Sequence, residues 1–339
     1  MIDFQKLPSP CFVLDEQLLD RNLAVIDRVR RESGAEVIVA LKACAMWSIF
    51  PELAQHSDGA TASSLAEARL VFEEFGRPAH TYAPVYTDRN IEEILDCSDH
   101  ITFNSVAQFE RFGQMALLRG ISCGLRINPG YSPVEGLHFH VLCESRPEHL
   151  RLALDAVEKR FGRFLDRIKW LNMGGGHLMT HKDYDCDELI RILQEFKAKY
   201  PNLRLILEPG SAFTWRTGYL VSTVEDIVEN GGVRTAMLDC LEMPYKPAIL
   251  GARDPEPGEK GWRMGGNSCL AGDYYGDWIF DRDLRVGDRI VFEDMIHYTM
   301  VKTTMFNGVA HPAIAIVRRD GAIEIIREFG YEDFKSRMS

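Results

Sequence analysis

Short apolar segments recur along the first two thirds of the chain, roughly twenty residues apart, with amphipathic charged stretches between them. Two of the stretches, residues 64–76 and 187–200, have apolar residues at intervals of three and four, which predicts helices. Continuous apolar strands that alternate with amphipathic helices are typical of a parallel sheet covered by helices. Eight such units predict an α/β protein with a (β/α)8 barrel. The eight segments are 37–43, 59–64, 80–84, 100–105, 121–129, 135–142, 169–176 and 203–210.

One connection in this pattern is too short. A parallel crossover needs about a dozen residues or more, usually with a helix. Only residues 130–134 separate the fifth segment from the sixth. Either one of these two strands is misassigned or the chain lacks a segment at this point.

The pattern changes after residue 210. Segments 219–230, 287–295, 298–306 and 313–319 are rich in β-formers and are separated by glycine and proline, and few amphipathic helices remain. We therefore expect the barrel at residues 10–217 and a C-terminal β domain at residues 218–339, joined by residues 1–9.

Composition narrows the class of protein. The chain is 46% hydrophobic and 26% charged, and no apolar stretch approaches the roughly 20 residues of a membrane span. Its first residues lack the basic start and apolar region of a secretory signal, and its eight cysteines form no C-x-x-C pair. This is typical of reduced thiols, so we expect a cytoplasmic protein. The net charge of −11 disfavours nucleic acid and favours cationic ligands.

Functional groups in such barrels lie at the carboxyl ends of the strands. Lys42 stands in the run VALKA, and a lysine in an apolar strand needs a partner or a lowered pKa. Such an amine can form a Schiff base with an aldehyde; a lysine that extends to the rim is the alternative. His138 and His140 share one face and can stack on a planar cofactor or transfer protons. Metal binding is the alternative for this pair, but no cluster of further ligands accompanies it, so no metal is expected.

The last two barrel segments end in residues suited to a phosphate and to a ring nitrogen. Gly174–Gly176 allow backbone N–H groups to approach an anion, although a tight turn also uses such glycines. Glu208, followed by Pro209 and Gly210, can keep a pyridine nitrogen protonated or form a structural salt bridge. In the β part, Cys269 is a candidate acid or nucleophile, although a lone cysteine is more often inert.

Nine blocks of the chain resemble a known family, the fold-type III decarboxylases that use pyridoxal 5′-phosphate (PLP). Ornithine, arginine and diaminopimelate decarboxylases belong to it, and alanine racemase is a more distant relative. The resemblance covers nearly the whole chain and is strongest to members that convert carboxynorspermidine and carboxyspermidine to norspermidine and spermidine. The blocks are PSPCFVLDE, ALKACAMWSIFP, GATASSLAEARL, GLHFHVLCES, NMGGGH, EPGSAF, LEMPYKP, GGNSCLAGD and FEDMIHYTMVKT.

The resemblance implies an alanine racemase-like fold, a PLP-binding (β/α)8 barrel followed by a C-terminal β domain. It also implies a homodimer with shared active sites, which acts on a small cationic substrate of polyamine biosynthesis. Three residues match positions at the cofactor ring. Lys42 matches the Schiff-base lysine, His140 the histidine stacked on the ring, and Glu208 the carboxylate that faces the pyridine nitrogen.

Seven further residues match the phosphate and substrate sites of the family. Gly174–Gly176 and Gly210 match the phosphate site, and Tyr298 matches a tyrosine that reaches the phosphate. Cys269 matches the cysteine that the partner subunit supplies, the group that would return a proton to the α-carbon. Asp273 matches a position that contacts the distal amine of the substrate.

The chain departs from the family pattern at three places. The family has a longer segment before Glu135, where the fifth crossover is short, and extra residues, including a histidine, between Asp239 and the LEMPY block. Ornithine and arginine enzymes often carry arginine where Ser211 stands, so phosphate binding here depends more on the backbone.

Three alternatives remain open. Diaminopimelate, ornithine or arginine decarboxylation uses the same fold. A PLP-binding protein without catalysis is a second alternative, against which the presence of both Cys269 and Asp273 counts. A metal-dependent barrel hydrolase that uses His138 and His140 is a third.

Overall fold

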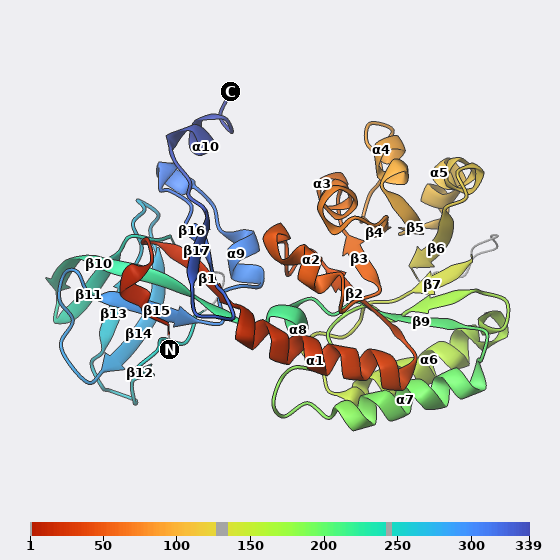
Figure 1. Ribbon diagram of the computed structural model, residues 1–339, viewed down its shortest axis with the longest axis horizontal. Coiled ribbons are helices and arrows are strands. Elements are labelled where there is room, and N and C mark those ends of the chain that lie inside the picture. The colour runs from red at the N-terminus through yellow and green to blue at the C-terminus, as the bar shows by residue number, and fades with distance from the viewer. Residues whose placement is uncertain (1, 127–134, 242–245) are drawn as a thin grey trace. The chain divides into compact units, whose positions relative to one another are not determined.

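The computed structural model describes residues 2–126, 135–241 and 246–339 (Figure 1). The chain forms two compact units, a barrel unit (Arg21–Phe213) and a β unit (Met1–Asp20 with Thr214–Ser339). Strand β1 (Cys11–Asp15) pairs with strands of the β unit, antiparallel to β10 (Gly218–Asn230) and parallel to β16 (Ala313–Val317). The expected barrel start at residue 10 is therefore too early, because long-range pairing places β1 in the other unit.

The barrel unit is built on eight parallel strands that close into a ring, since the first strand pairs with the last. Each of the eight predicted segments overlaps one strand, so the predicted barrel is confirmed. The strands are β2 (Glu36–Ala40), β3 (Gly59–Ala62), β4 (Ala79–Tyr82), β5 (Ser98–Phe103), β6 (Ser122–Arg126), β7 (Gly136–His138), β8 (Trp170–Asn172) and β9 (Arg204–Leu207).

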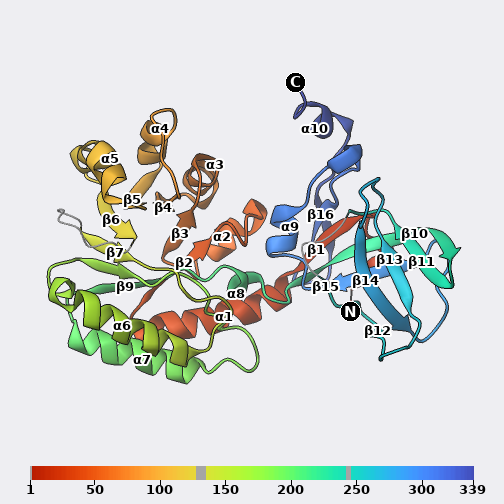
Figure 2. The same ribbon diagram turned by 180° about the vertical axis from the view of Figure 1, so that it is seen from behind.

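Helices lie outside this ring, and α6 and α7 run side by side in both views (Figures 1 and 2). They carry stripes of buried apolar residues, such as Leu189, Leu193 and Phe196 on α7. The helices are α1 (Glu16–Ser33), η2 (Trp47–Ile49), α2 (Phe50–Leu53), α3 (Leu65–Leu70), η3 (Val71–Phe75), α4 (Ile91–Asp96), α5 (Val106–Leu118), α6 (Pro147–Leu165), α7 (Cys186–Lys199) and α8 (Ser211–Thr214).

The crossover between β6 and β7 resolves one of the two sequence alternatives. The two strands pair in parallel, with Arg126 opposite His138, so neither strand was misassigned. Between the two strands only Glu135 is described, and the short stretch 130–134 falls within residues 127–134, outside the described part of the chain. The short stretch after Asp239 likewise runs into residues 242–245, which are not described.

The β unit contains a mixed sheet in the order β12-β14-β13-β11-β10-β1-β16-β17, and β15 also pairs with β10. The segment 298–306, which is rich in β-formers, contains no strand, because residues 298–302 form helix α9. Residues that favour strands form them only where a neighbouring strand is available for pairing, so β propensity alone does not exclude a short helix. The remaining elements are η1 (Phe4–Lys6), β11 (Val233–Leu238), β12 (Ala252–Arg253), β13 (Trp262–Gly265), β14 (Tyr274–Phe280), β15 (Arg289–Glu293), α9 (Tyr298–Lys302), η4 (Phe306–Gly308), β17 (Ile323–Arg327) and α10 (Tyr331–Lys335).

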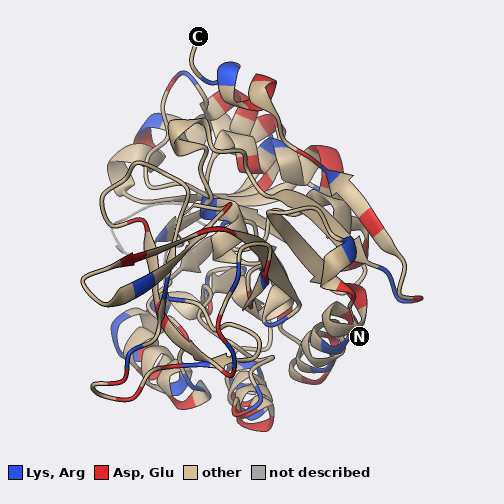
Figure 3. Ribbon diagram, turned by 90° about the vertical axis from the view of Figure 1, so that its left-hand side faces the viewer, with Lys and Arg blue, Asp and Glu red and all other residues tan. Residues whose placement is uncertain are grey.

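The structure shows where the charged residues lie and that the cysteines are unpaired. Acidic and basic residues are mixed along the ribbon (Figure 3), and α7 carries acidic residues in its first turn and lysines in its last, which complements the helix dipole. All eight cysteines are free thiols. Within the described ranges, none of the helices has the length and apolar character that crossing a bilayer requires.

A large indole fills part of the barrel interior because two neighbouring strands carry glycine beside it. Trp170 is buried against Ile38 and Ile206, and its Nε1 donates to Ser122 Oγ over 2.9 Å. A Cβ atom on Gly136 would lie 2.0 Å from the indole ring. The glycine on β7 is therefore a packing requirement of the barrel.

We expect Gly136→Ala to lower the free energy of unfolding by about 1–3 kcal/mol, because the added methyl group overpacks the interior. The matched control is Gly162→Ala on α6, where a Cβ meets nothing within 4 Å, and where alanine should stabilise the helix by up to about 1 kcal/mol. Urea unfolding of both variants measures the difference. Equal stability of the two variants would contradict the packing argument.

Candidate active site

Lys42 lies two residues beyond the end of β2, and its side chain is exposed. The expectation that it stands inside an apolar strand is therefore wrong, because the strand ends at Ala40 and the chain turns. The position nevertheless places the amine at the carboxyl end of the first barrel strand, where barrel enzymes carry their chemistry. Its charge is one of the influences that act on the nearby His140 ring.

The ring of His140 is fixed by the glycine loop that follows β8. The Gly175 N–H donates to His140 Nδ1 over 2.9 Å, so this nitrogen is the acceptor and the proton of the neutral ring is on Nε2. Burial, and then the charge of Lys42, lowers the pKa of His140 to about 4. At neutral pH the site therefore presents an uncharged, oriented aromatic ring.

Glu208 follows β9 and its carboxylate is buried inside the barrel. Asn172 Nδ2 donates to Glu208 Oε1 over 2.7 Å, and His138 Nε2 lies 3.4 Å from Oε2. Burial alone would raise the pKa of Glu208, but the electrostatic contribution of His138 and the hydrogen bond from Asn172 outweigh it and lower the pKa to about 2. The barrel thus keeps one buried carboxylate ionised throughout the physiological range.

The glycine loop, Gly174–Gly176, has fewer free donors than its sequence indicates. The Gly174 N–H donates to Asn172 Oδ1 over 2.9 Å, and the Gly175 N–H is used by His140. Among the described residues, the N–H groups of Gly176 and Gly210 have no protein acceptor. Gly176 in the loop and Gly210 after β9 are thus the glycine donors that remain for an anion.

Close backbone packing brings the first and last strands of the barrel together. The Ala40 N–H donates to the Pro209 carbonyl over 3.3 Å, and a Cβ atom on Gly210 would lie 2.5 Å from the Cβ of Ala43. Another side chain at Gly210 would therefore displace the turn that carries Lys42. The structure thus gathers Lys42, His140, Glu208 and the glycines at one end of the barrel.

The β unit carries the three other predicted residues. Asp273 is buried, and its Oδ2 accepts from the N–H (3.0 Å) and the hydroxyl (2.6 Å) of Ser268, whereas Oδ1 has no partner among the described residues. Cys269 is exposed and its N–H donates to Asn307 Oδ1. Tyr298 is the half-buried first residue of α9.

The sequence did not single out Asn172 or His177. Asn172 is the one polar residue between Trp170 and the glycine loop. A polar residue at the end of an apolar strand was the sequence feature that could have identified it. His177 follows the loop and is buried; its Nδ1 lies 3.1 Å from the hydroxyl of Tyr184. Burial, and then His140, lowers the pKa of His177 to about 4, so it is neutral at pH 7.

The described residues contain one group of potential metal ligands, and neither His138 nor His140 belongs to it. That group is His80, Asp99 and His100, near the amino-terminal ends of β4 and β5. Arg204 donates to His100 Nε2 over 3.4 Å, so the proton of the ring is on Nδ1, 2.8 Å from Asp99 Oδ1. This arrangement is a hydrogen-bond chain, since the nitrogen nearest the carboxylate carries a hydrogen.

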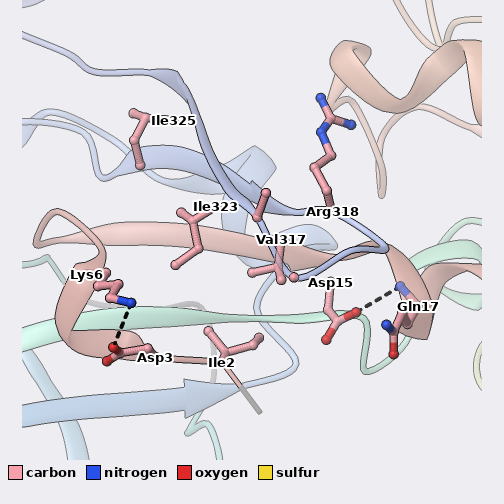
Figure 4. Close-up of a pocket in the computed structure, with 11 residues that line it drawn as sticks. Ile2, Asp3, Lys6, Asp15, Gln17, Val317, Arg318, Ile323 and Ile325 are labelled. Carbon is pink, nitrogen blue, oxygen red and sulfur yellow. Dashed lines mark hydrogen bonds and ion pairs between the residues drawn. The ribbon is translucent and has the colours of Figure 1, made fainter.

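A surface pocket in the β unit is separate from these groups (Figure 4). Apolar side chains such as Val317 and Ile323 line it together with charged ones. Lys6 pairs with Asp3 at 3.5 Å, whereas Arg318 pairs with glutamates that do not line the pocket. None of the candidate residues lines it.

Comparison with known proteins identifies the family, although no family model matches the chain. The carboxynorspermidine/carboxyspermidine decarboxylase of Campylobacter jejuni is 35% identical, over 98% of this chain and 99% of the relative. The crystal structure of carboxynorspermidine decarboxylase from Campylobacter jejuni, complexed with norspermidine, matches with a TM-score of 0.90 at 36% identity, over 98% of this chain and 100% of that chain. The chain belongs to the carboxynorspermidine/carboxyspermidine decarboxylase family.

Membership of this family makes the protein a fold-type III decarboxylase, a carboxy-lyase of polyamine biosynthesis. A further relative, the carboxyaminopropylagmatine decarboxylase of Synechocystis sp., is 48% identical over 370 residues, which is 98% of this chain and 96% of the relative. That alignment is longer than the 339-residue chain, so the relative has internal residues that this chain lacks. The sequence predicts that residues are lacking at two places, in the short crossover after β6 and in the short stretch after Asp239.

We expect the buried His177 to make stability fall with acid. In the unfolded chain a histidine has a pKa near 6.5, so between pH 6.5 and 4 the unfolded state binds a proton that folded His177 does not. Stability should fall over that range, by up to about 1.4 kcal/mol per pH unit for this group. Urea unfolding of His177→Gln at several pH values should give a shallower decline, whereas the exposed His149→Gln should match the wild type. Equal slopes for all three proteins would show that His177 is not buried in its neutral form.

Proposed function

We propose that the protein is a PLP-dependent decarboxylase that removes the α-carboxylate of a carboxylated polyamine. The observation that carries the proposal is the buried, ionised Glu208 carboxylate at the same barrel end as Lys42, His140 and the glycine loop. A buried anion is costly unless it is paired. His138 and Asn172 already contact this carboxylate, and a pyridinium N–H would be a further, cationic donor to it.

Two features support the fit of PLP to these residues. A Cβ atom on Gly175 would lie 2.5 Å from the Glu208 carbonyl oxygen and 3.2 Å from the His140 ring, so only glycine leaves the space beside the ring open. The N–H groups of Gly176 and Gly210, which have no acceptor among the described residues, suit a phosphate. The resemblance matches Tyr298 to a tyrosine that reaches this phosphate.

In the proposed reaction, bound PLP supplies an electron-withdrawing ring that accepts the electron pair left when carbon dioxide departs. The residues of the chain do the rest. Lys42 provides the amine that binds the cofactor aldehyde, and the neutral His140 ring stacks on its face without adding charge. Glu208 holds the proton on the ring nitrogen, and Cys269 returns a proton to the α-carbon.

The first candidate substrates are carboxynorspermidine and carboxyspermidine, which the Campylobacter jejuni relatives are named for. The net charge of −11 favours a polycation, and Asp273 offers a buried carboxylate oxygen without a partner to the distal amine. The second candidate is carboxyaminopropylagmatine, favoured by the 48% identity to the Synechocystis relative. The candidates differ at the distal end, which is an amine in the first case and a guanidine in the second.

Release of carbon dioxide from each substrate by the PLP-loaded enzyme tests this proposal. We expect kcat/KM for the carboxylated polyamines to exceed that for diaminopimelate, ornithine and arginine by roughly 100-fold or more, because a short substrate leaves the distal carboxylate unpaired. Lys42→Ala should release none, and borohydride should attach PLP to a peptide that contains Lys42 in the wild type alone. A preference for the guanidine substrate selects the second candidate. A preference for diaminopimelate, or PLP attached at another lysine, would refute the proposal.

We also propose that the enzyme acts as a homodimer with active sites shared between subunits. Cys269 and Asp273 belong to the β unit, whereas Lys42 and Glu208 belong to the barrel unit. The resemblance assigns the cysteine to the neighbouring subunit, and a two-fold interface repeats every contact, so a dimer would contain two composite sites.

Subunit mixing tests the shared site. Lys42→Ala and Cys269→Ala are each expected to be inactive. A mixture of the two should recover roughly a quarter of wild-type activity, because about half of the random dimers are heterodimers with one intact site each. The Lys42→Ala protein mixed with itself is the control. No recovery after demonstrated subunit exchange would show that each chain builds its own site.

A further inference from the structure

The side-chain amide of Asn172 is bound at both of its polar atoms. Its Nδ2 donates to Glu208 Oε1 over 2.7 Å, and its Oδ1 accepts from the Gly174 N–H over 2.9 Å. The partners assign the amide orientation, because the loop N–H requires an acceptor and the carboxylate requires a donor. The side chain is 4% exposed, so no bulk water replaces either bond.

We propose that Asn172 is a positioning residue that holds the Glu208 carboxylate and the glycine loop in one fixed relation. The inference rests on the proposed function, because Glu208 and the loop are the groups that would hold opposite ends of PLP. Asn172 acts through these two groups and is not itself a catalytic residue.

The main chain around Asn172 supports this role. The Glu208 N–H donates to the Gly174 carbonyl over 2.8 Å, so the loop and the end of β9 are already joined by backbone. Asn172 adds control of the carboxylate itself, which the backbone bond does not reach. His138 Nε2 lies 3.4 Å from the other carboxylate oxygen, so the Glu208 carboxylate has a neighbour on each side.

Asparagine is the residue type that this position requires. Aspartate has the same shape and keeps an acceptor for the Gly174 N–H, but it loses the donor and places a second carboxylate against Glu208. Two carboxylates at this distance share one proton. The shared proton would reduce the negative charge that Glu208 offers to a ring nitrogen. Alanine would leave both Glu208 Oε1 and the Gly174 N–H without their partner.

The test uses three variants of the PLP-loaded enzyme: Asn172→Asp, Asn172→Ala and the double variant Asn172→Asp/Glu208→Gln. Asn172→Asp should move the ¹⁵N chemical shift of the labelled PLP ring nitrogen toward its neutral value. It should also weaken PLP binding and lower kcat, each by about tenfold or more. Asn172→Ala should weaken PLP binding further, since the loop loses its bond as well.

The double variant separates positioning from charge. Its new amide at position 208 can donate to its new carboxylate at position 172, which restores the bond with its direction reversed. PLP affinity should therefore return to within about threefold of the wild type, whereas kcat stays low because an amide does not keep the ring nitrogen protonated. The matched control is Asn104→Asp, which adds the same charge just after β5, where the side chain accepts from Tyr82 and has no carboxylate partner in the described contacts. It should leave the ¹⁵N shift and PLP affinity unchanged.

Three outcomes would overturn the inference. They are a wild-type ¹⁵N shift and PLP affinity in Asn172→Asp, a double variant that binds PLP no better than Asn172→Asp, and a control that behaves like Asn172→Asp. Thermal unfolding of each apo protein shows whether the variant folds, and the nearly isosteric Asn172→Asp decides the result if Asn172→Ala does not. Failure of the wild type to bind PLP would instead refute the proposed function.

Discussion

The arrangement of strand ends at this side of the barrel depends on the buried carboxylate of Glu208. An isolated anion inside a barrel would become protonated or would unfold its surroundings. It stays ionised because His138 and Asn172 project toward it from the ends of neighbouring strands. That arrangement depends on strand register, since His138 pairs opposite Asn172 and Asn172 opposite Ile206. A slip of one residue would turn each side chain to the other face of its strand.

Glycines at three positions allow the packing and the backbone turn that this register requires. Gly136 admits the Trp170 indole within the ring of strands, while Gly174 and Gly176 have positive φ angles of 72° and 94°. Those angles suit glycine and strain other residues. They turn the chain after β8 so that one N–H meets Asn172 and the next meets His140. The loop is thus shaped by its own hydrogen bonds, and fewer of its N–H groups remain for a ligand than three consecutive glycines indicate.

The sequence predicted the barrel because apolar strands and amphipathic helices are local patterns, and all eight segments overlap barrel strands. It did not predict that β1 joins the β unit, because that depends on pairing with residues about 200 and about 300 positions away. The end of the strand before Lys42 was missed because the apolar run VALKA continues past Ala40, and the exposed position of Lys42 agrees with the alternative of a lysine at the rim. Asn172 was missed because its role depends on two hydrogen bonds, one to the distant Glu208 carboxylate and one from the Gly174 backbone N–H. A sequence shows neither contact.

The two units would divide the proposed chemistry between the two ends of the substrate. Groups that would act on the α-amino acid end of a substrate, an end common to every decarboxylase of this fold, lie in the barrel unit on the ends of rigid strands. Asp273, the group proposed for the variable distal end, lies in the β unit near the short stretch after Asp239. Its Oδ2 is occupied by Ser268, which leaves Oδ1 as the one oxygen available to a cation. A single oxygen fits an ammonium group as a point charge, whereas a guanidinium prefers two parallel acceptors. Recognition of a guanidine end would therefore require a second acceptor beside Asp273. If Asp273 has the proposed role, the residues around it, rather than the barrel, would decide between the two candidate substrates.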